Sequence, residues 1–437
     1  MKPLDSAKAK TKDKPSAAYS IGMGFVTAGM IILPLIYIAF TVLVCWSVYF
    51  FATHYFVEIW EWPIGHSKFS LLAKIVCSIT PLLVGAAIAI AMVKPLFARR
   101  GTKMQPIVLL PDVEPRVHAM AQDVCRRVGA PAPKRIEINC DLNASAGFNR
   151  GWRGFFKNEL ILTIGMPLVA GLTERQLAGV IAHEFGHFRQ GAGMRLSYLI
   201  RSVNFWFARV VYERDAWDET LAGFGQSESI WIVLMVGCAR AGVALSRGIL
   251  WLLMMTGHGI SGFLMRQMEY DADKWEARIA GSDSLEATLL RLNSLGHVLE
   301  KIHLEMRRSW RNRFQLPDNL PLLMEYRANC LDPEKRASIE NRAGLSKTGF
   351  FDTHPSVAER IRFARRLAEP GAIANDSPAR DLFDNFEGVG RLVTLAHYDD
   401  DLNVPVTPDF LIPVARFIEG PTGSGGSTMP GQSRHVG

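Results

Sequence analysis

An uncharged run near the start of the chain constrains its fold more than any other feature. Between Lys14 and Glu58 the sequence contains no Asp, Glu, Lys or Arg. The stretch from Met23 to Phe51 is apolar and long enough to cross a bilayer, even with Pro34 inside it. A cleaved signal peptide is the competing interpretation, but its apolar core would be shorter, whereas this run continues into the aromatic segment Trp46 to Phe56. The run therefore predicts a transmembrane helix.

A second uncharged stretch, Ile75 to Val93, is just long enough to span and completes a helical hairpin. The loop between the two spans holds Glu58, Glu61 and only one lysine, Lys68. The outer ends of the hairpin are basic, so the positive-inside rule places both flanks, and the chain that follows, in the cytoplasm. These basic residues are Lys2, Lys8, Lys10, Lys12 and Lys14 before the first span and Arg99, Arg100 and Lys103 after the second.

Composition excludes several classes of protein. With 49% hydrophobic and 21% charged residues, the chain is neither disordered nor collagen-like. Its six cysteines are scattered without a CxxC pair, which indicates a reducing compartment and no cysteine zinc site. Arginines cluster around Trp310, but no nucleic-acid motif accompanies them, so we expect no nucleic-acid partner.

Globular patterning begins after Gln105. Thr173 and Gln176 are spaced as a capping box, with Leu172 and Leu177 as the flanking hydrophobic staple. They predict a helix that starts at Thr173 and ends near Arg189. The other elements expected before it are a helix over Glu114 to Val128 and strand-like runs over Arg135 to Cys140 and Glu159 to Ile164.

Two later apolar stretches leave alternatives open. Gly191 to Val211 carries three arginines and is a third span, an interfacial helix or a buried core helix. Within Ile230 to Met265, a polar stripe of Arg240, Arg247 and His258 is expected to face a bundle interior. The alternative there is a soluble core helix with snorkelling arginines, because three glycines weaken a continuous helix.

The sequence His183-Glu184-Phe185-Gly186-His187 matches H-E-x-x-H. On a helix, the two histidines at i and i+4 point from one face and are spaced to hold one zinc ion. Glu184 then lies beside the metal and can serve as general base and acid in peptide hydrolysis. The alternative interpretation is two core histidines beside a surface glutamate.

A zinc site needs a third protein ligand. The metzincin continuation fails, because Gln190 and Gly193 stand where Gly and His are required. A later glutamate is therefore expected. Glu269 and Asp273 lie at i and i+4 on a predicted helix, so that one carboxylate can bind zinc while the other hydrogen-bonds a ligand histidine.

These motifs resemble those of the HtpX and CAAX prenyl protease family of integral membrane zinc metalloendopeptidases. The run Leu177 to His187 is similar to the family's zinc helix, and Glu269 with Asp273 matches its E-x-x-x-D motif. The resemblance covers roughly Met23 to Leu367. It implies that Glu269 is the third zinc ligand and that Asp273 lies beside the ligands without binding the metal. It also implies one Zn²⁺ per chain.

Two peripheral motifs complete the resemblance. Asn143-Ala144-Ser145-Ala146 is similar to the family's N-A-x-A strand, which lines the substrate cleft, and Thr353-His354-Pro355 with Arg360 is similar to its late H-P…R motif. Independently, Arg135 to Ala146 is expected to form a strand whose exposed edge binds an extended peptide, or else a loop without function. His354 and Arg360 are expected to supply positive charge near the tetrahedral oxyanion, or to be an ordinary helix start and surface arginine.

The sequence as a whole predicts a mainly α fold with a small β-sheet, that is, an α+β zincin-like protease domain with transmembrane helices. The predicted function is a membrane-anchored zinc metalloendopeptidase that cleaves polypeptide in membrane protein quality control, with its protease domain on the cytoplasmic side of a bacterial inner membrane. A non-cleaving membrane adaptor and a prenyl-CAAX endoprotease are the alternatives. The expected segments are a basic N-terminal segment (1–20), a transmembrane hairpin (21–103), two parts of the protease domain (104–190 and 263–370), a membrane-associated insertion between these parts (191–262), and a C-terminal extension with a disordered tail (371–437).

Overall fold

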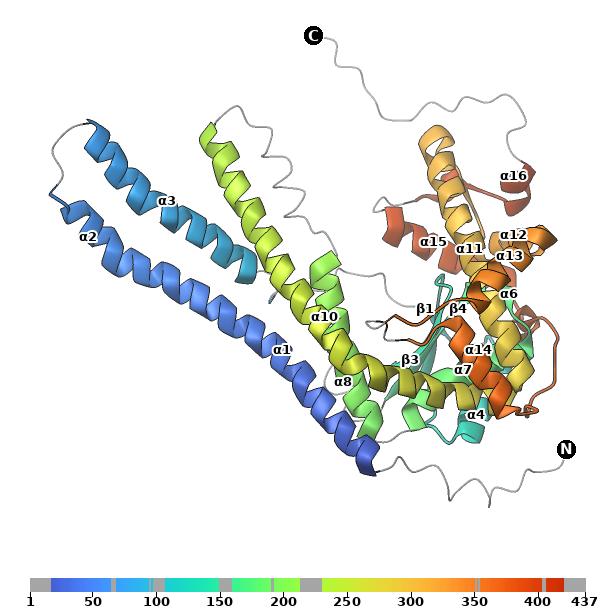
Figure 1. Cartoon of the computed structure of the whole chain (residues 1–437). Coiled ribbons are helices and arrows are strands. Elements are labelled where there is room, and N and C mark those ends of the chain that lie inside the picture. The colour runs from blue at the N-terminus through green and yellow to red at the C-terminus, as the bar shows by residue number, and fades with distance from the viewer. Residues whose placement is uncertain are drawn as a thin grey trace, which may run out of the picture. The chain divides into compact units, whose positions relative to one another are not determined.

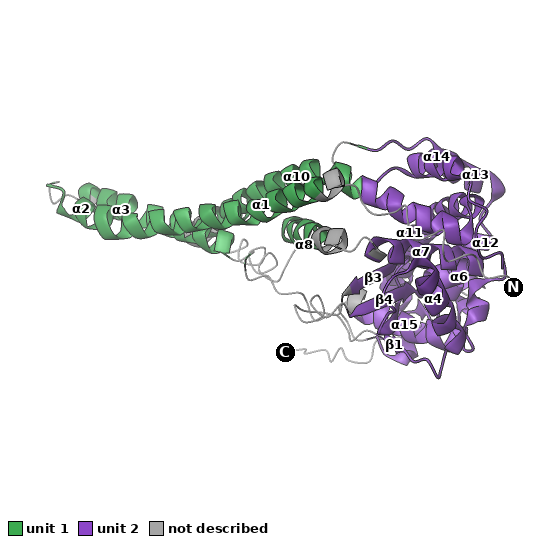
Figure 2. Cartoon of the chain, turned by 90° about the horizontal axis from the view of Figure 1, so that it is seen from below, with its two compact units in different colours: residues 1–101, 192–266, 349–353 green, residues 102–191, 267–348, 354–437 purple. Residues whose placement is uncertain are grey.

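The computed structural model describes residues 17–63, 68–93, 96, 107–148, 159–189, 192–212, 230–349, 352, 354–402 and 406–419. The chain divides into two compact units, which Figure 2 colours separately. The first unit combines residues 1–101, 192–266 and 349–353, and the second combines 102–191, 267–348 and 354–437. The basic residues predicted to flank the hairpin and the tail from Pro421 to Gly437 lie outside the described residues.

Long apolar helices make up the first unit (Figure 1). Helix α1 (Ala17–Phe50) continues through the π-helical turn η1 (Phe51–Tyr55) into α2 (Phe56–Glu61), and α3 (Lys68–Val93) follows. Both predicted spans are therefore confirmed as helices of spanning length. In the described part of the chain, the helices long and apolar enough to cross a membrane are Ile21–Glu61, Phe69–Val93 and Arg240–Ala280.

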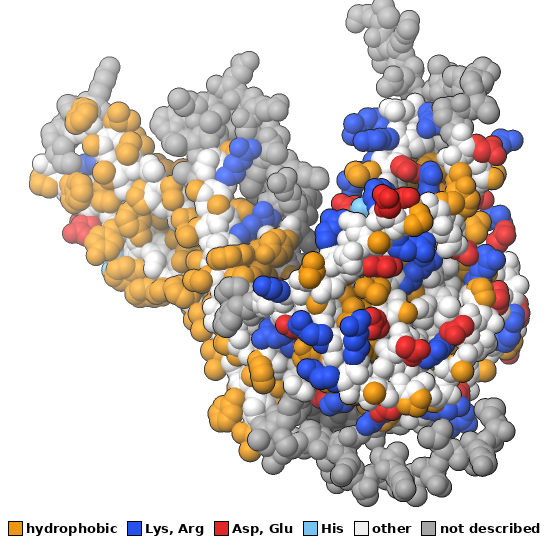
Figure 3. Space-filling view, turned by 45° about the vertical axis from the view of Figure 1, so that its right-hand side comes forward, with side chains coloured by type: hydrophobic (Ala, Val, Ile, Leu, Met, Phe, Trp, Pro, Cys, Tyr) orange, Lys and Arg blue, Asp and Glu red, His pale blue; other side chains and the backbone are white. Residues whose placement is uncertain are grey.

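Apolar side chains cover the outer faces of these helices, as Figure 3 shows in orange. Phe25 is 76% exposed and Phe69 is 80% exposed. A helix that is apolar all round is typical of a membrane span, where lipid contacts the side chains. Pro34 and Pro81 lie inside α1 and α3 without ending either helix.

A buried tyrosine holds the helices of the first unit together. The Tyr37 hydroxyl donates to the carbonyl of Met92 at 2.9 Å and shares a 2.8 Å hydrogen bond with Ser246 Oγ. Its ring also meets Trp206 of α8 (Ala192–Tyr212) edge-on, with the centroids 6.4 Å apart. Residues from four separate helices thus meet at Tyr37, which has no exposed surface.

Helix α10 (Ile230–Ala280) is one uninterrupted helix of 51 residues. Its glycines do not break it, because Gly257 packs against Met30 and Leu33, with 3.1 Å between a built Cβ and Leu33 Cδ1. Arg240 is exposed, and Arg247 and His258 are half-buried, so the stripe that is expected to face the interior is only partly buried. The buried stripe consists instead of small and apolar residues, namely Gly242, Ser246, Leu250, Met254, Gly257 and Ser261.

A four-stranded mixed sheet with strand order β1-β2-β4-β3 lies in the second unit. Strand β2 (Arg135–Asn139) pairs in parallel with β4 (Leu160–Gly165) and antiparallel with β1 (Ile107–Leu109). Strand β3 (Ala144–Phe148) pairs antiparallel with β4 and forms the edge of the sheet. Ile136, Leu162 and Ile164 are buried and contribute to the core.

The predicted single strand over Arg135 to Ala146 is therefore wrong, because the chain reverses between Asn139 and Ala144. Asp141 N–H donates to Asn139 Oδ1 at 3.2 Å, which forms a local side-chain turn. Gly165 N–H donates to Asn143 O at 2.9 Å, and a Cβ at Gly165 would lie 1.8 Å from Asp141 O. This close approach seats the turn against β4 and returns β3 to the edge.

Helices surround this sheet (Figure 1). The predicted helices appear as α4 (Pro115–Val128) and α7 (Glu174–Arg189), so both predictions are confirmed. The other elements are α6 (Met166–Gly171), α11 (Ser282–Arg313), β5 (Leu316–Pro317), α12 (Leu320–Asn329), α13 (Pro333–Gly344), α14 (Val357–Leu367), η3 (Ala379–Leu382), α15 (Phe386–Leu402), η4 (Pro408–Phe410), β6 (Leu411–Ile412) and α16 (Val414–Glu419).

Candidate metal centre

Helix α7 begins with the capping box that the sequence predicts. Thr173 N–H donates to Gln176 Oε1 at 3.0 Å, and Gln176 N–H donates to Thr173 Oγ1 at 3.3 Å. These reciprocal bonds satisfy two backbone donors that a helix start leaves without partners. The cap fixes the helical phase, so that His183 and His187 both lie on one buried face.

Two glycines let α10 pack closely against that face. A Cβ built on Gly186 would lie 3.2 Å from Ala272 Cα, and one built on Gly179 would lie 2.8 Å from Ala280 Cβ. The glycines are seven residues apart, which is close to two helical turns and puts them on one side of α7. Their missing side chains allow the histidines of α7 to reach carboxylates on α10.

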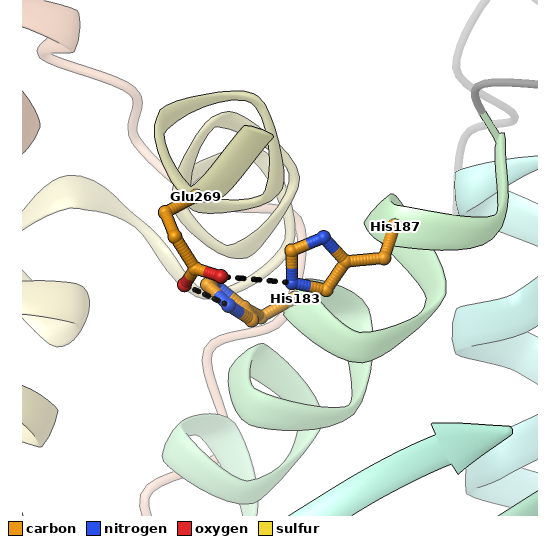
Figure 4. Close-up of side chains that lie close together, drawn as sticks. All are labelled: His183, His187 and Glu269. Carbon is orange, nitrogen blue, oxygen red and sulfur yellow. Dashed lines mark ion pairs between the residues drawn. The ribbon is translucent and has the colours of Figure 1, made fainter. Parts of the chain in front are cut away.

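The donor atoms of three residues converge at this contact, as Figure 4 shows. His183 Nε2 lies 3.4 Å from Glu269 Oε2, and His187 Nε2 lies 3.7 Å from Glu269 Oε1. Ligands about 2.0–2.1 Å from a tetrahedral ion are separated by about 3.3–3.4 Å, so these spacings fit a metal site. Two imidazoles and a carboxylate are a donor set that binds zinc. All three residues are buried.

Asp273 and Arg360 orient the first of these histidines. Asp273 is fully buried, and its Oδ1 lies 3.1 Å from His183 Nδ1, the ring nitrogen that faces away from Glu269. Arg360 donates to Asp273 from Nε at 3.0 Å and from Nη2 at 2.5 Å. A carboxylate on the distal nitrogen fixes the tautomer and direction of a ligand histidine. The pair therefore holds the Nε2 atom of His183 toward Glu269.

The position of Arg360 differs from the expectation that it faces an oxyanion. Burial would lower the pKa of its guanidinium, but the adjacent Asp273 carboxylate raises that pKa above the ordinary range. Its Nε and Nη2 atoms both donate to Asp273, so Arg360 influences the candidate metal site through Asp273 and His183.

The surrounding carboxylates also act on His183 itself. Burial would lower its pKa, but hydrogen bonds with Asp273, Glu269 and Glu276 raise the pKa well above its usual value. These carboxylates therefore favour the charged form of the His183 ring over the neutral form.

Glu276 is a residue of this site that the sequence reasoning missed. Its side chain is buried, and its Oε2 lies 3.4 Å from His183 Nδ1 and 3.9 Å from Arg360 Nη2. Its spacing is the signal that could have found it, because Glu269, Asp273 and Glu276 stand at i, i+4 and i+7 on one helix face. His183, Asp273 and Glu276 also lie close enough to form a second metal-binding trio. Because Arg360 is directed into that trio, we interpret it as the hydrogen-bonding shell of His183.

Glu184 follows His183 on α7 and contacts the sheet. Its Oε2 accepts a 3.2 Å hydrogen bond from the backbone N–H of Ala146 on edge strand β3. The candidate substrate motif is Asn143, Ala144, Ser145 and Ala146, of which Asn143 immediately precedes the strand. The structure thus brings edge strand β3 against α7 at Glu184, the residue next to His183 in the sequence.

His354 approaches the centre from a different segment. Its Nδ1 lies 3.3 Å from Glu269 Oε1, and its side chain is 65% exposed. His354 is therefore beside the third candidate ligand and open to solvent. Thr353, which precedes it in the motif, lies outside the described residues.

Comparisons with known proteins indicate the family of the chain. The model of peptidase family M48 matches residues 111–368. Protease HtpX of Acinetobacter baumannii strain AYE is 27% identical over 233 residues, which are 52% of this chain and 63% of that protein. Protease HtpX of Pseudomonas syringae pv. tomato is 24% identical over 226 residues, 50% of this chain and 61% of that protein. The chain therefore spans less than two thirds of the length of these relatives.

Among solved structures, the crystal structure of S. mikatae Ste24p matches with a TM-score of 0.28 and 16% sequence identity. The match covers 76% of this chain and 67% of that protein.

Proposed function

The chain belongs to peptidase family M48, and we propose that it is a membrane-anchored zinc metalloendopeptidase. One observation carries this proposal. His183 and His187 direct Nε2 atoms at the Glu269 carboxylate, while Glu184, between them in sequence, accepts a hydrogen bond from the backbone of edge strand β3. A metal site and a general base thus adjoin a surface that can hold extended peptide.

In this proposal His183, His187 and Glu269 hold the zinc ion, and Asp273 orients His183. A zinc ion at this site would polarise the scissile carbonyl and make water a stronger nucleophile near neutral pH. Glu184 Oε2 accepts a proton from the attacking water and then donates it to the nitrogen of the leaving amine. His354, exposed beside Glu269, is the remaining candidate to donate a hydrogen bond to the developing oxyanion.

The edge of β3 supports a polypeptide substrate. Ala146 directs its N–H toward Glu184, away from the paired strand β4, so the same edge can pair with an extended chain. Backbone pairing gives affinity with little dependence on side chains. We therefore propose that Ala144 and Ala146 bind the substrate main chain and that specificity is broad.

We further propose that the second unit faces the cytoplasm of a bacterium and acts in quality control of inner-membrane proteins. The basic residues on both sides of the hairpin support this orientation through the positive-inside rule. The similar HtpX proteases come from bacteria, which supports the bacterial location.

Glu184→Gln tests the proposed mechanism. The amide cannot accept the proton, so cleavage of an unfolded membrane protein should stop while the zinc content stays at the wild-type level. A proteome comparison of membranes with wild-type and Glu184→Gln protein should then identify proteins that only the wild type cuts. Equal cleavage by both would refute the proposal. Metal-loaded wild type that binds substrate without turnover would indicate an adaptor, and cleavage restricted to prenylated peptides would indicate a CAAX endoprotease.

A further inference from the structure

The segment Glu369–Ala379, which we call the strap, crosses the two helices that carry the candidate ligands. It begins immediately beyond residue 368, where the family match ends. The strap hydrogen-bonds both the first turn of α7 and the last turn of α10, and both turns lie far from it in the sequence.

At α7 the strap satisfies backbone donors of the first turn. Glu174 N–H donates to Ser377 O at 2.8 Å, and Arg175 N–H donates to Asn375 O at 2.9 Å. Asn375 Nδ2 donates in turn to Glu174 Oε2 at 2.6 Å. Amides of the first turn have no acceptor within their own helix. The strap therefore acts as a cap supplied by a distant part of the chain.

At α10 the strap satisfies an acceptor of the last turn. Ala372 N–H and Ile373 N–H both donate to Ile279 O at 2.9 Å. Gly371 adopts a φ of +84°, and a Cβ there would lie 2.7 Å from the carbonyl carbon of Ala280. Only glycine fits both the backbone conformation and the close approach.

The side chain of Arg175 joins the three parts. Its Nε donates to Ala280 O at the end of α10, and its Nη2 donates to Asp283 Oδ1 at 2.7 Å. Its Nη1 lies 3.9 Å from Asp376 Oδ2 of the strap. The side chain is only 15% exposed although it carries a charge. Arg175 thus connects the start of α7, the end of α10 and the strap.

We propose that the strap sets the relative position of α7 and α10, and that Arg175 is a positioning residue for the metal ligands. His183 follows Arg175 by eight residues, so Arg175 lies about 12 Å along the helix from this candidate ligand. A small rotation of α7 at that point changes the distance between its imidazoles and Glu269. The inference rests on the proposed metal site.

Metal binding by the full-length protein in detergent tests the inference. Arg175→Met removes the side-chain contacts of Arg175 with α10, Asp283 and the strap. Arg380→Met is the matched control, because Arg380 pairs with Glu325 at 3.0 Å and none of its described ion pairs involves α7 or α10. Competition with a chromophoric chelator gives the Zn²⁺ dissociation constant, and the visible spectrum of the Co²⁺-loaded protein reports ligand geometry. Thermal unfolding of the metal-free variants measures any general loss of stability.

We expect Arg175→Met to raise the Zn²⁺ dissociation constant about 10-fold, the low end of the effect of losing a direct outer contact to a ligand, and to change the Co²⁺ spectrum. Arg380→Met should match the wild type in both. A folded Arg175→Met protein with the wild-type spectrum and a dissociation constant within about twofold would overturn the inference. If that variant fails to fold, Asn375→Ala, which deletes the bond to Glu174, provides the same test with a smaller shift. Failure of the wild type to bind Zn²⁺ would instead refute the proposed function.

Discussion

Replacing Arg360 with methionine should destabilise the second unit strongly. Arg360 makes the two short hydrogen bonds to Asp273, whose carboxylate has no exposed surface. Methionine fills much of the same space but leaves that buried carboxylate without its guanidinium partner, and Glu276 loses the same nearby cation. Removing one partner of a buried ion pair costs about 3–5 kcal/mol. We expect Arg360→Met to lower the free energy of unfolding of the metal-free protein by that amount.

Urea unfolding in detergent, followed by tryptophan fluorescence, measures this change. Arg365→Met is the matched control on the same helix, because Arg365 pairs with Glu286 at the surface, where its side chain is 66% exposed. That control should unfold close to the wild type. In Arg360→Met/Asp273→Asn the buried charge is also gone, so a large part of the lost stability should return. An Arg360→Met protein within about 1 kcal/mol of the wild type would refute the argument that Asp273 depends on Arg360.

Three further changes test other contacts. Gly186→Ala places a Cβ 3.1 Å from Trp275 Cδ1. Although alanine has the better helix propensity, this substitution should lower the free energy of unfolding by about 1–3 kcal/mol in urea titrations. An unchanged or raised free energy of unfolding would contradict the close packing. Thr173→Ala removes the capping acceptor of α7 and should cost about 1 kcal/mol in the same assay, whereas no loss would show that the cap is dispensable. The hydrogen bond from Arg365 lowers the pKa of Glu286 in the folded protein, so this pair stabilises the fold at pH values above the pKa of Glu286 in the unfolded chain, and the stabilisation is lost as the pH falls through the folded pKa. Thermal unfolding across this acidic range should therefore depend less on pH in Glu286→Gln than in the wild type. An unchanged pH dependence would contradict the assignment.

The local features of the site follow from the sequence. A capping box sets the phase of α7 within one turn, and the i, i+4 spacing of His183 and His187 then fixes their common face. The same rule pairs Glu269 with Asp273 on α10. These relations depend on residues a few positions apart, so a single sequence is sufficient to predict them.

Contacts between distant segments did not follow from the sequence. The place of β3 at the sheet edge depends on how the turn after Asn139 seats against Gly165. Arg360 resembles an ordinary surface arginine until α14 packs beside Asp273. The strap acts mainly through backbone hydrogen bonds, which leave no side-chain pattern to detect. In α10, tertiary packing around Gly257 outweighs the low helix propensity of glycine.

The most direct test of the central claim is the zinc content of the purified full-length protein and its Glu269→Ala variant. Elemental analysis after dialysis against trace chelator should find one zinc per chain in the wild type and in Glu184→Gln, which retain all three ligands. In Glu269→Ala, which loses the carboxylate between His183 and His187, it should find almost none. One zinc per chain in a folded Glu269→Ala protein, or none in the wild type, would contradict the account.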